Sequence, residues 1–392
     1  MSTKVFLRSF GCQMNEADSE LVRGILSQAG FSVTDNEEDA DIVLLNTCAV
    51  RDHAVRRVEG YVHDLRHRAK ERPLLVGILG CIPTHLKEEL IHDKNLNIDF
   101  IAGPDSYRRL PELINASQTS NDKISDLELS ITENYEGINP QREKGINAWV
   151  TIMRGCDNFC AYCVVPYTRG RERSKAPQKV LDEVFNAVNS GFPQVTLLGQ
   201  NVNSYKYIDW DFAKLLTEVS QVPGLRRVRF VAPHPKDFPV KLLEVMKDHR
   251  NICRHIHLPL QAGNDRVLKM MNRNYTQEQF RALVAQMRAY FPKLVLTTDI
   301  IVGFPTETDA EFEDTFKIMR EIEFDSAFIF KYSERQGTLA AKRYKDDVPP
   351  DKKTERIVRL NELQKEISLK KKSWAHWRDP RNYSGGPNHG KI

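Results

Sequence analysis

The feature that most restricts the fold of this chain is a repeated alternation of short apolar runs with amphipathic stretches. Such alternation is typical of strand–helix units that build a largely parallel β-sheet. It occurs over residues 1–116 and again from residue 145 onward, and the polar, turn-rich segment 117–144 predicts a linker. A chain of 392 residues can bury more than one core. We therefore expect two α/β domains.

The apolar runs predict where the strands and helices lie. In the first domain we expect strands at Val5–Phe10, Asp41–Asn46, Leu74–Leu79 and Ile98–Ala102, and helices at Asp18–Ala29, Ala49–Lys70 and Thr84–Ile91. In the second domain we expect strands at Ala148–Met153, Val195–Leu198, Arg226–Val231, His255–Pro259, Leu294–Val302 and Ser326–Phe330. Successive strand–helix units of this kind predict a partial (β/α)6 barrel. A closing helix is expected from Pro350 to about Lys372, followed by an irregular tail over residues 373–392.

Composition restricts the compartment and the partners. No apolar run approaches the roughly 20 residues of a membrane helix, and the N-terminus lacks a secretory signal, so we expect a soluble cytoplasmic protein with no membrane partner. In a reducing compartment the seven cysteines are better candidates for metal ligands than for disulfides. A net charge of +4 permits an RNA partner without requiring one. Basic residues gather at Arg169–Lys175 and at Lys352–Lys372, the second of which is more typical of a solvated helix face.

Cys156, Cys160 and Cys163, called here the loop cysteines, form a C-x3-C-x2-C run after the first strand of the second domain. Three thiolates on one short loop can ligate three irons of a [4Fe-4S] cluster and leave the fourth iron open. The amine and carboxylate of S-adenosylmethionine (SAM) can chelate that iron, and reductive cleavage then yields a 5′-deoxyadenosyl radical. A structural zinc site is the alternative, but it takes four ligands, and no fourth lies at standard spacing. Tyr162 is expected either to stack on the adenine of SAM or to lie in the core.

Cys12, Cys48 and Cys81, called here the sheet-edge cysteines, are dispersed in the sequence, yet each ends a strand-like run and precedes a helix. The carboxyl ends of parallel strands share one edge of the sheet, so we expect these cysteines to converge there. Helix N-termini at that edge would favour thiolates. Gly11 and Gly80, each directly before one of these cysteines, would let the backbone approach a bulky group. We expect a second cluster there, although any one of these cysteines could be a small buried hydrophobe.

The stretches around both cysteine sets resemble the methylthiotransferase family of radical SAM enzymes over nearly all of residues 4–370. The resemblance is carried by Ser9–Asn15, Asn46–Arg51, Ile152–Cys156, Val165–Ser174 and Leu198–Tyr205. Within these, Pro166–Arg173 is similar to the branch that modifies adenosine, and the branch that methylthiolates an aspartate of a ribosomal protein differs there.

The resemblance implies an activity that uses two [4Fe-4S] clusters and SAM. It assigns SAM cleavage to the cluster of the loop cysteines and sulfur supply to the cluster of the sheet-edge cysteines. One SAM would methylate a sulfur of the second cluster. Another would give the radical that abstracts hydrogen from C2 of N6-isopentenyladenosine at position 37 of tRNA. The expected product is 2-methylthio-N6-isopentenyladenosine.

Further residues are implied to contact SAM. The candidates on strand ends are Gly199, Gln200, Asn201 and Gln261. They would lie at the carboxyl face, where the chemistry of a barrel is found, although the three amide side chains could equally cap loops. Arg171 and Arg173 are candidates for the SAM carboxylate or for tRNA phosphate, with water as the alternative partner.

The family also implies partners and alternatives. The expected partners are the anticodon stem-loop of tRNA and an electron donor such as flavodoxin or ferredoxin, and we expect a monomer. Family members usually continue into a small β-barrel RNA-binding domain called TRAM, and nothing after Lys372 is predicted as strand, so we expect that domain to be missing. Alternative substrates are threonylcarbamoyl-adenosine in tRNA and a ribosomal-protein aspartate. The alternative from another class is a non-catalytic metal-binding or RNA-binding protein.

Overall fold

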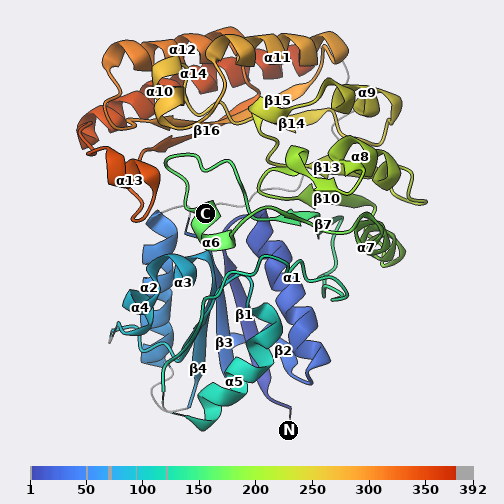
Figure 1. The fold of residues 1–392 in the computed structure, drawn as a ribbon, viewed down its shortest axis with the longest axis vertical. Helices are drawn as coiled ribbons and strands as arrows, with labels where there is room; N and C mark the ends of the chain where they lie inside the picture. Colours follow the sequence, from blue (N-terminus) through green and yellow to red (C-terminus); the bar gives the residue numbers. More distant parts are fainter. Residues whose placement is uncertain (1, 50–51, 69–72, 94, 121, 377–392) are drawn as a thin grey trace. The chain divides into compact units, whose positions relative to one another are not determined.

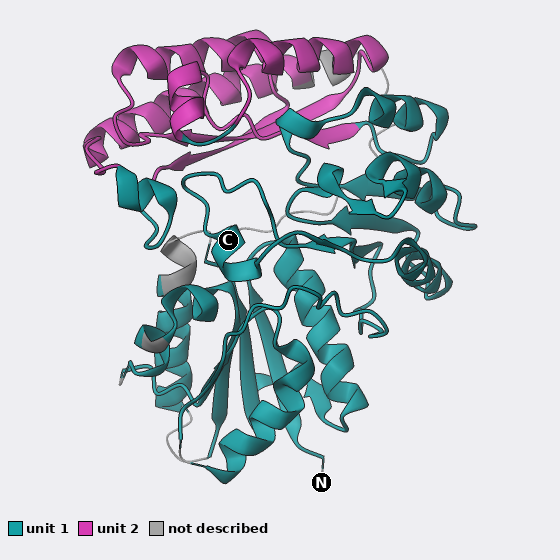
Figure 2. Ribbon diagram, viewed as in Figure 1, with its two compact units in different colours: residues 1–254, 271–273, 333–343 teal, residues 255–270, 274–332, 344–392 magenta. Residues whose placement is uncertain are grey.

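The computed structural model describes residues 2–49, 52–68, 73–93, 95–120 and 122–376. They fall into two compact units (Figure 2): unit 1 comprises residues 1–254, 271–273 and 333–343, and unit 2 comprises residues 255–270, 274–332 and 344–392. Within the described part of the chain, no helix combines the length and apolar character needed to cross a membrane.

The first part of unit 1 is built on a six-stranded parallel sheet with the order β2-β1-β3-β4-β5-β6 (Figure 1). Its strands are β1 (Lys4–Phe10), β2 (Ser32–Thr34), β3 (Ile42–Thr47), β4 (Leu75–Gly80), β5 (Phe100–Ala102) and β6 (Ile124–Asp126). The four strands expected from the apolar runs are all present. The edge strands β2 and β6 are not predicted, because three residues are too few to show an alternating pattern.

Helices cover both faces of this sheet (Figure 1). On one face lie α1 (Gln13–Gln28) and α5 (Leu110–Thr119), with the short η2 (Tyr107–Arg109) before α5. On the other face lie α2 (Asp52–Arg68), α3 (Cys81–Leu86) and α4 (Glu88–Ile91), and η1 (Glu37–Asp39) precedes β3. Because both faces are covered, the central strands β3 and β4 are almost continuously apolar, and all six residues of β3 are buried.

The segment expected to be a linker is partly regular. The helix α5 continues through Thr119, and β6 then extends the sheet beyond β5. Farther along, Tyr135 is buried, its ring stacks on Tyr107, and its hydroxyl donates to the carbonyl of Pro104 at 2.8 Å. A single aromatic side chain thus anchors a stretch whose composition is otherwise polar.

The rest of unit 1 contains a three-stranded parallel sheet with the order β13-β10-β7. Its strands are β7 (Asn147–Thr151), β10 (Gln194–Leu198) and β13 (Arg227–Phe230). The helices are α6 (Val165–Arg169), α7 (Pro177–Asn189), α8 (Phe212–Ser220), α9 (Val240–Asp248) and α13 (Leu339–Arg343), with η3 (Val202–Ser204) and η4 (Pro235–Asp237). Two antiparallel pairs join β8 (Met153–Arg154) to β9 (Arg173–Ser174) and β11 (Lys206–Tyr207) to β12 (Trp210–Asp211).

Unit 2 contains a second three-stranded parallel sheet, with the order β14-β15-β16. Its elements are β14 (His255–His257), α10 (Asp265–Met270), α11 (Gln277–Tyr290), β15 (Val295–Val302), α12 (Asp309–Ile322), β16 (Ser326–Lys331) and α14 (Pro350–His376). The six strands expected for the second domain are therefore all present, three in each unit. The expected irregular tail begins later than residue 373, because α14 continues to His376, and residues 377–392 lie outside the described residues.

Candidate functional site

The sheet-edge cysteines converge at the carboxyl edge of the six-stranded sheet. Phe10 pairs with Thr47, and Thr47 pairs with Gly80, so β1, β3 and β4 end in register. Cys12 is then the N-cap of α1, Cys48 directly follows β3, and Cys81 begins α3. The Cys12 residue is exposed, whereas Cys48 and Cys81 are buried. The convergence follows from equal strand ends rather than from closeness in sequence.

A buried polar network fixes the geometry of this edge. Asn15 Nδ2 donates to Asn46 Oδ1 and to the carbonyl of Thr47, both at 3.0 Å. Asn46 Nδ2 in turn donates to the carbonyl of Asn15 at 2.9 Å and to Ser19 Oγ at 3.0 Å. Asn15 Oδ1 lies 3.3 Å from Cys12 Sγ and accepts its hydrogen bond. The end of β3 and the start of α1 are therefore locked together beside the first cysteine.

Gly11 and Gly80, which were expected to let the backbone approach a bulky group, pack closely against neighbouring protein atoms. A Cβ on Gly11 would lie 2.5 Å from Asn15 Oδ1 and 2.9 Å from the Cβ of Cys48. Gly80 has φ of 93°, and a Cβ there would lie 2.5 Å from the carbonyl oxygen of Thr47. Neither position has room for a side chain.

The surroundings of Cys12 favour the thiolate form of its side chain. A hydrogen bond with the Cys48 side chain lowers the pKa of Cys12 to about 6, with help from Arg169. Although Cys12 is exposed as a residue, its thiol is partly desolvated by surrounding protein atoms, and this desolvation opposes the change in pKa. A thiolate, not a thiol, is the ligand that iron takes. Arg169 is buried near Cys81 and Cys12; burial alone would lower the pKa of its guanidinium, but Cys81 and Asp18 raise it well above its usual value.

The loop cysteines follow β8 on a tightly folded segment. The Cys156 backbone N donates to the carbonyl of Gly170 at 3.1 Å, and the Cys163 backbone N donates to the carbonyl of Cys160 at 3.0 Å. Gly155, with φ of 78°, has no room for a side chain, because a Cβ would lie 2.0 Å from the carbonyl oxygen of Arg171. Arg273 Nη1 donates to Cys160 Sγ at 3.4 Å and places a positive charge beside the set.

Burial raises the pKa of Cys156 to about 11, and burial together with the neighbouring Cys160 raises the pKa of Cys163 to about 12. Cys156 and Cys163 therefore stay protonated at neutral pH until a cation binds them, so metal binding at this loop would release protons.

Among the residues that the structure describes, no three His, Cys, Asp or Glu side chains are arranged to hold a single metal ion. A four-iron cluster takes each thiolate on a separate iron. The donor sets consist of cysteine alone, which is the chemistry that iron–sulfur clusters require.

The expected SAM contacts in unit 1 divide into two kinds. Gln200 Oε1 is buried and has no hydrogen-bond partner among the described residues, so it can accept from a ligand amine. Asn201 instead shapes its own loop, because its Oδ1 accepts from the backbone N of His234 at 3.2 Å. A Cβ on Gly199 would lie 2.6 Å from Met153 Cγ, which makes this position a close packing point. Tyr162, beside Cys163, is half-buried.

The two arginines expected at the site are engaged with the protein. Arg173 is buried, pairs with Asp105 at 2.8 Å, and donates to the carbonyls of Glu133, Arg169 and Arg171. Arg171 is exposed and makes two hydrogen bonds to the Asp157 carboxylate, at 2.6 and 3.1 Å. Arg169, which the sequence interpretation did not select, is the arginine of this run on whose pKa Cys81 and Cys12 act.

Gln261, the remaining candidate, belongs to unit 2. Its backbone N donates to the carbonyl of Asp299 at 2.8 Å, and its own carbonyl accepts from Ile301 N at 2.9 Å. Its φ is 68°, and its Oε1 is buried without a partner among the described residues. The amide is therefore available to a ligand, while its backbone extends the pairing of β15.

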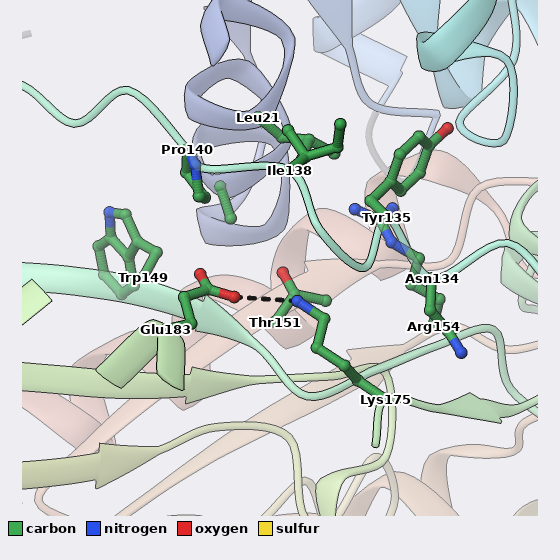
Figure 3. A pocket seen from close by; sticks show the side chains of 11 residues that line it. Leu21, Asn134, Tyr135, Ile138, Pro140, Trp149, Thr151, Arg154, Lys175 and Glu183 are labelled. Carbon is green, nitrogen blue, oxygen red and sulfur yellow. Dashed lines mark hydrogen bonds and ion pairs between the residues drawn. The ribbon is translucent and has the colours of Figure 1, made fainter. Parts of the chain in front are cut away.

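One small cavity lies beneath α1 in unit 1 (Figure 3). Its lining includes Tyr135, Trp149 and Arg154. It also includes the ion pair Lys175–Glu183, whose Nζ–Oε2 distance is 2.9 Å. Its volume of about 20 Å³ suffices for a water molecule and not for SAM. We assign it to packing.

Comparisons with known proteins match both parts of the chain. Residues 150–319 match the family model described as the radical SAM superfamily, and residues 4–103 match the model described as uncharacterized protein family UPF0004. The first match contains the loop cysteines and the second contains the sheet-edge cysteines.

Two curated relatives are similar over most of their length. The tRNA-2-methylthio-N(6)-dimethylallyladenosine synthase of Porphyromonas gingivalis is 45% identical over 376 residues, which covers 93% of this chain and 80% of the relative. The synthase of the same name from Chlorobium phaeovibrioides is 47% identical over 367 residues, covering 93% of this chain and 81% of the relative.

Solved structures share the fold at low identity. The radical SAM methyltransferase TsrM from Kitasatospora setae, solved with cobalamin and a [4Fe-4S] cluster, superposes with a TM-score of 0.65 at 14% identity, covering 87% of this chain and 74% of TsrM. The cobalamin-dependent SAM radical enzyme OxsB gives a TM-score of 0.60 at 13% identity, covering 91% of this chain and 56% of OxsB. These likenesses support the α/β architecture of an N-terminal parallel sheet followed by a radical SAM domain.

Proposed function

Because this chain belongs to the radical SAM family of tRNA-2-methylthio-N(6)-dimethylallyladenosine synthases, we propose that it methylthiolates C2 of N6-isopentenyladenosine at position 37 of tRNA. The observation that carries the proposal is the in-register ending of β1, β3 and β4, which gathers three cysteines from separate strand–helix units at one sheet edge. A family likeness alone would not require that arrangement. The same chain supplies a second three-cysteine loop after β8.

The proposed cofactors are two [4Fe-4S] clusters and SAM. When bound, a cluster on the loop cysteines would supply the electron that cleaves SAM, and a cluster on the sheet-edge cysteines would supply sulfur. In this proposal, residues 1–116 carry the sulfur-supplying site, residues 117–144 connect, and residues 145–372 carry SAM cleavage. The chain itself holds three thiolates at each site and leaves one iron of each cluster without a protein ligand.

The chain's own groups have distinct roles in the proposal. Arg273, which donates to Cys160 Sγ, stabilises negative charge on the loop cysteines. Within unit 1, Gln200 offers a buried amide oxygen, without a partner among the described residues, that can accept from the amine or ribose of SAM. Arg171 is exposed, so it can exchange its ion pair with Asp157 for one with a phosphate of tRNA or with the carboxylate of SAM. The proposed partners are the tRNA anticodon stem-loop and an electron donor of the flavodoxin or ferredoxin type. We further propose that the protein is a monomer in the cytoplasm.

The direct test is an anaerobic turnover assay. Reconstituted protein is mixed with SAM, a strong reductant and tRNA that carries isopentenyladenosine, and the nucleosides and small molecules are analysed by mass spectrometry. We expect 2-methylthio-N6-isopentenyladenosine together with 5′-deoxyadenosine. The matched control is the same tRNA with unmodified adenosine 37, which should give no methylthio product. If protein with both clusters loaded gives neither product, the proposed function is wrong.

Two cysteine variants separate the roles of the two sites. Cys160→Ala should abolish formation of 5′-deoxyadenosine, because it removes one ligand of the SAM-cleaving site. Cys48→Ala should leave cleavage of SAM intact and abolish methylthio transfer, because it removes one ligand of the sulfur-supplying site. The loss of cleavage in both variants would contradict the separation of roles.

A further inference from the structure

A cluster of charged side chains is buried between α1, α6 and the segment around β8. Asp18 accepts from Arg154 at 2.6 Å and from Arg169 at 2.8 Å, and all three side chains are at most 5% exposed. Arg154 also lies over the ring of Tyr135, 4.6 Å from its centroid; both side chains are labelled in Figure 3. Asp105 and Arg173 form a second buried pair nearby. Residues of α1 are thereby joined to both ends of the segment that carries the loop cysteines.

The charges in this cluster do not balance. The carboxylates of Asp18 and Asp105 face the guanidiniums of Arg154, Arg169 and Arg173, and all five residues are buried. Burial alone would raise the pKa of Asp18, but Arg154 and Arg169 hold it below its usual value, so the carboxylate is ionised at neutral pH. Among these five buried residues the guanidiniums outnumber the carboxylates by one. A buried charge is costly unless an opposite charge compensates it.

Two buried polar groups in the same place lack partners. Arg169 Nη1 and Tyr107 Oη have no hydrogen-bond partner among the described residues, and both residues are at most 4% exposed. Arg169 is the last residue of α6, α6 packs against α3, and α3 begins at Cys81. The charges that act on Arg169 include Cys81 and Cys12, and those that act on Tyr107 include Cys81. The unused donors thus lie beside the sheet-edge cysteines.

We propose that Arg169 is the positioning residue for the sulfur-supplying cluster: Asp18 holds the guanidinium through Nη2, and Nη1 donates to a ligating thiolate or a cluster sulfur. Tyr107 Oη is the second donor to the same group. This inference rests on the proposed function, because it takes the sheet-edge cysteines as cluster ligands. An oxidised four-iron cluster with three thiolates carries about one negative charge, which matches the one guanidinium in excess.

The proposal predicts a redox effect. Reduction adds a negative charge to the cluster, and a neighbouring positive charge favours that change. Removing the charge of Arg169 should therefore shift the reduction potential of this cluster to more negative values. Removing the hydrogen bond should also weaken retention of the cluster, since outer-shell partners of metal sites typically contribute about 10- to 100-fold in affinity.

The test uses the full chain with all three loop cysteines replaced by alanine, so that any cluster signal belongs to the sheet-edge site. Arg169→Gln and Arg169→Lys are compared with Arg142→Gln in this parent. Arg142 is a matched control because it is also a buried arginine held by carboxylates of α1 and α7, Glu20 and Glu183. After reconstitution with iron and sulfide, iron per chain, loss of iron to a chelator and the potential from electron paramagnetic resonance titration are measured. Circular dichroism reports folding.

We expect Arg169→Gln to lose iron about 10- to 100-fold faster than Arg142→Gln and to have a more negative potential. Arg169→Lys should keep the reduction potential near that of the parent, because the positive charge remains. It should nevertheless lose iron faster than the parent, because one ammonium group cannot donate to Asp18 and to the cluster at the same time in the way the planar guanidinium can. If Arg169→Gln does not fold, the rate of iron loss from Arg169→Lys, compared with that from Arg142→Gln, tests the proposal by itself.

Two failures are distinguishable. If the parent without loop cysteines binds no four-iron cluster, the assignment of the sheet-edge site in the proposed function is wrong, and the role of Arg169 falls with it. If the parent binds the cluster and the Arg169 variants match Arg142→Gln in iron loss and potential, only the inference about Arg169 is overturned.

Discussion

Gly80→Ala is the substitution whose effect the structure specifies most fully. Gly80 precedes Cys81 and has φ of 93° and ψ of −143°, a conformation that L-residues rarely adopt. Its missing side chain also leaves room for the neighbouring strand end. An added Cβ would lie 2.5 Å from the carbonyl oxygen of Thr47 and 2.7 Å from Asn46 Oδ1. Neither atom can move freely, because Asn15 is hydrogen-bonded to both.

The expected magnitude is the sum of two effects. Backbone strain at such a position is on the order of 1–3 kcal/mol, and forcing an atom into a packed region typically costs about 1–3 kcal/mol. We therefore expect Gly80→Ala to lower the free energy of unfolding by about 4 kcal/mol. Gly30→Ala is the matched control, because Gly30 has φ of 87° and an added Cβ would meet no atom within 4 Å, so only the strain of about 1–3 kcal/mol applies.

The assay is denaturant unfolding of both metal-free variants, followed by circular dichroism, together with iron content after reconstitution. We expect Gly80→Ala to be the less stable variant and also to bind less iron, because the strand ends at Thr47 and Gly80, which directly precede Cys48 and Cys81, must separate to admit the methyl group. If the two variants are equally stable and bind equal iron, the close approach of the strand ends does not constrain this site.

Two further predictions concern the framework. Tyr135→Phe removes a hydroxyl that accepts from the backbone N of Tyr107 at 3.0 Å and donates to the carbonyl of Pro104, so it should lower the free energy of unfolding by about 1–3 kcal/mol in thermal or denaturant unfolding. The hydrogen bond from Arg266 lowers the pKa of Glu311 from 4.5 to about 2, although partial burial acts in the opposite direction. The free energy of unfolding contributed by ionised Glu311 is therefore fully present above pH 4.5 and is lost as the pH falls through about 2. Glu311→Gln should therefore cost about 1 kcal/mol at pH 7, and a difference that does not narrow below pH 4.5 would contradict this reasoning.

The sequence was sufficient to predict the strands that position the sheet-edge cysteines. The short, almost fully apolar runs of β3 and β4 indicate strands covered on both faces, β1 is a mixed apolar and polar run, and a cysteine follows the end of each of the three. Because parallel strands share their carboxyl edge, the convergence of Cys12, Cys48 and Cys81 could be inferred without knowing the strand order. The observed register of Phe10, Thr47 and Gly80 gives the physical basis for that inference.

The roles of the arginines could not be predicted in the same way. Arg169, Arg171 and Arg173 lie in one basic run, yet their side chains are 5%, 67% and 4% exposed. Their burial depends on how a five-residue helix and a two-residue strand pack against α1 and α3, and elements this short have no periodicity to read. The partner of Arg169, Asp18, lies 151 residues away in the sequence.

The short segment from Cys163 to Arg169 couples the two cysteine sets within unit 1. Val164 is 3% exposed and packs in the same apolar cluster as Val43, Ile78 and Cys81, so the loop cysteines are fastened directly to the core of the six-stranded sheet. The helix α6 has five residues, which corresponds to an axial length of about 8 Å. A loop cysteine and the arginine beside the sheet-edge cysteines are therefore on the order of 10 Å apart along this segment. Cys163 and the arginine beside the sheet-edge cysteines are thus carried by one short, tightly packed segment, so a change in the packing of α6 should affect both cysteine sets.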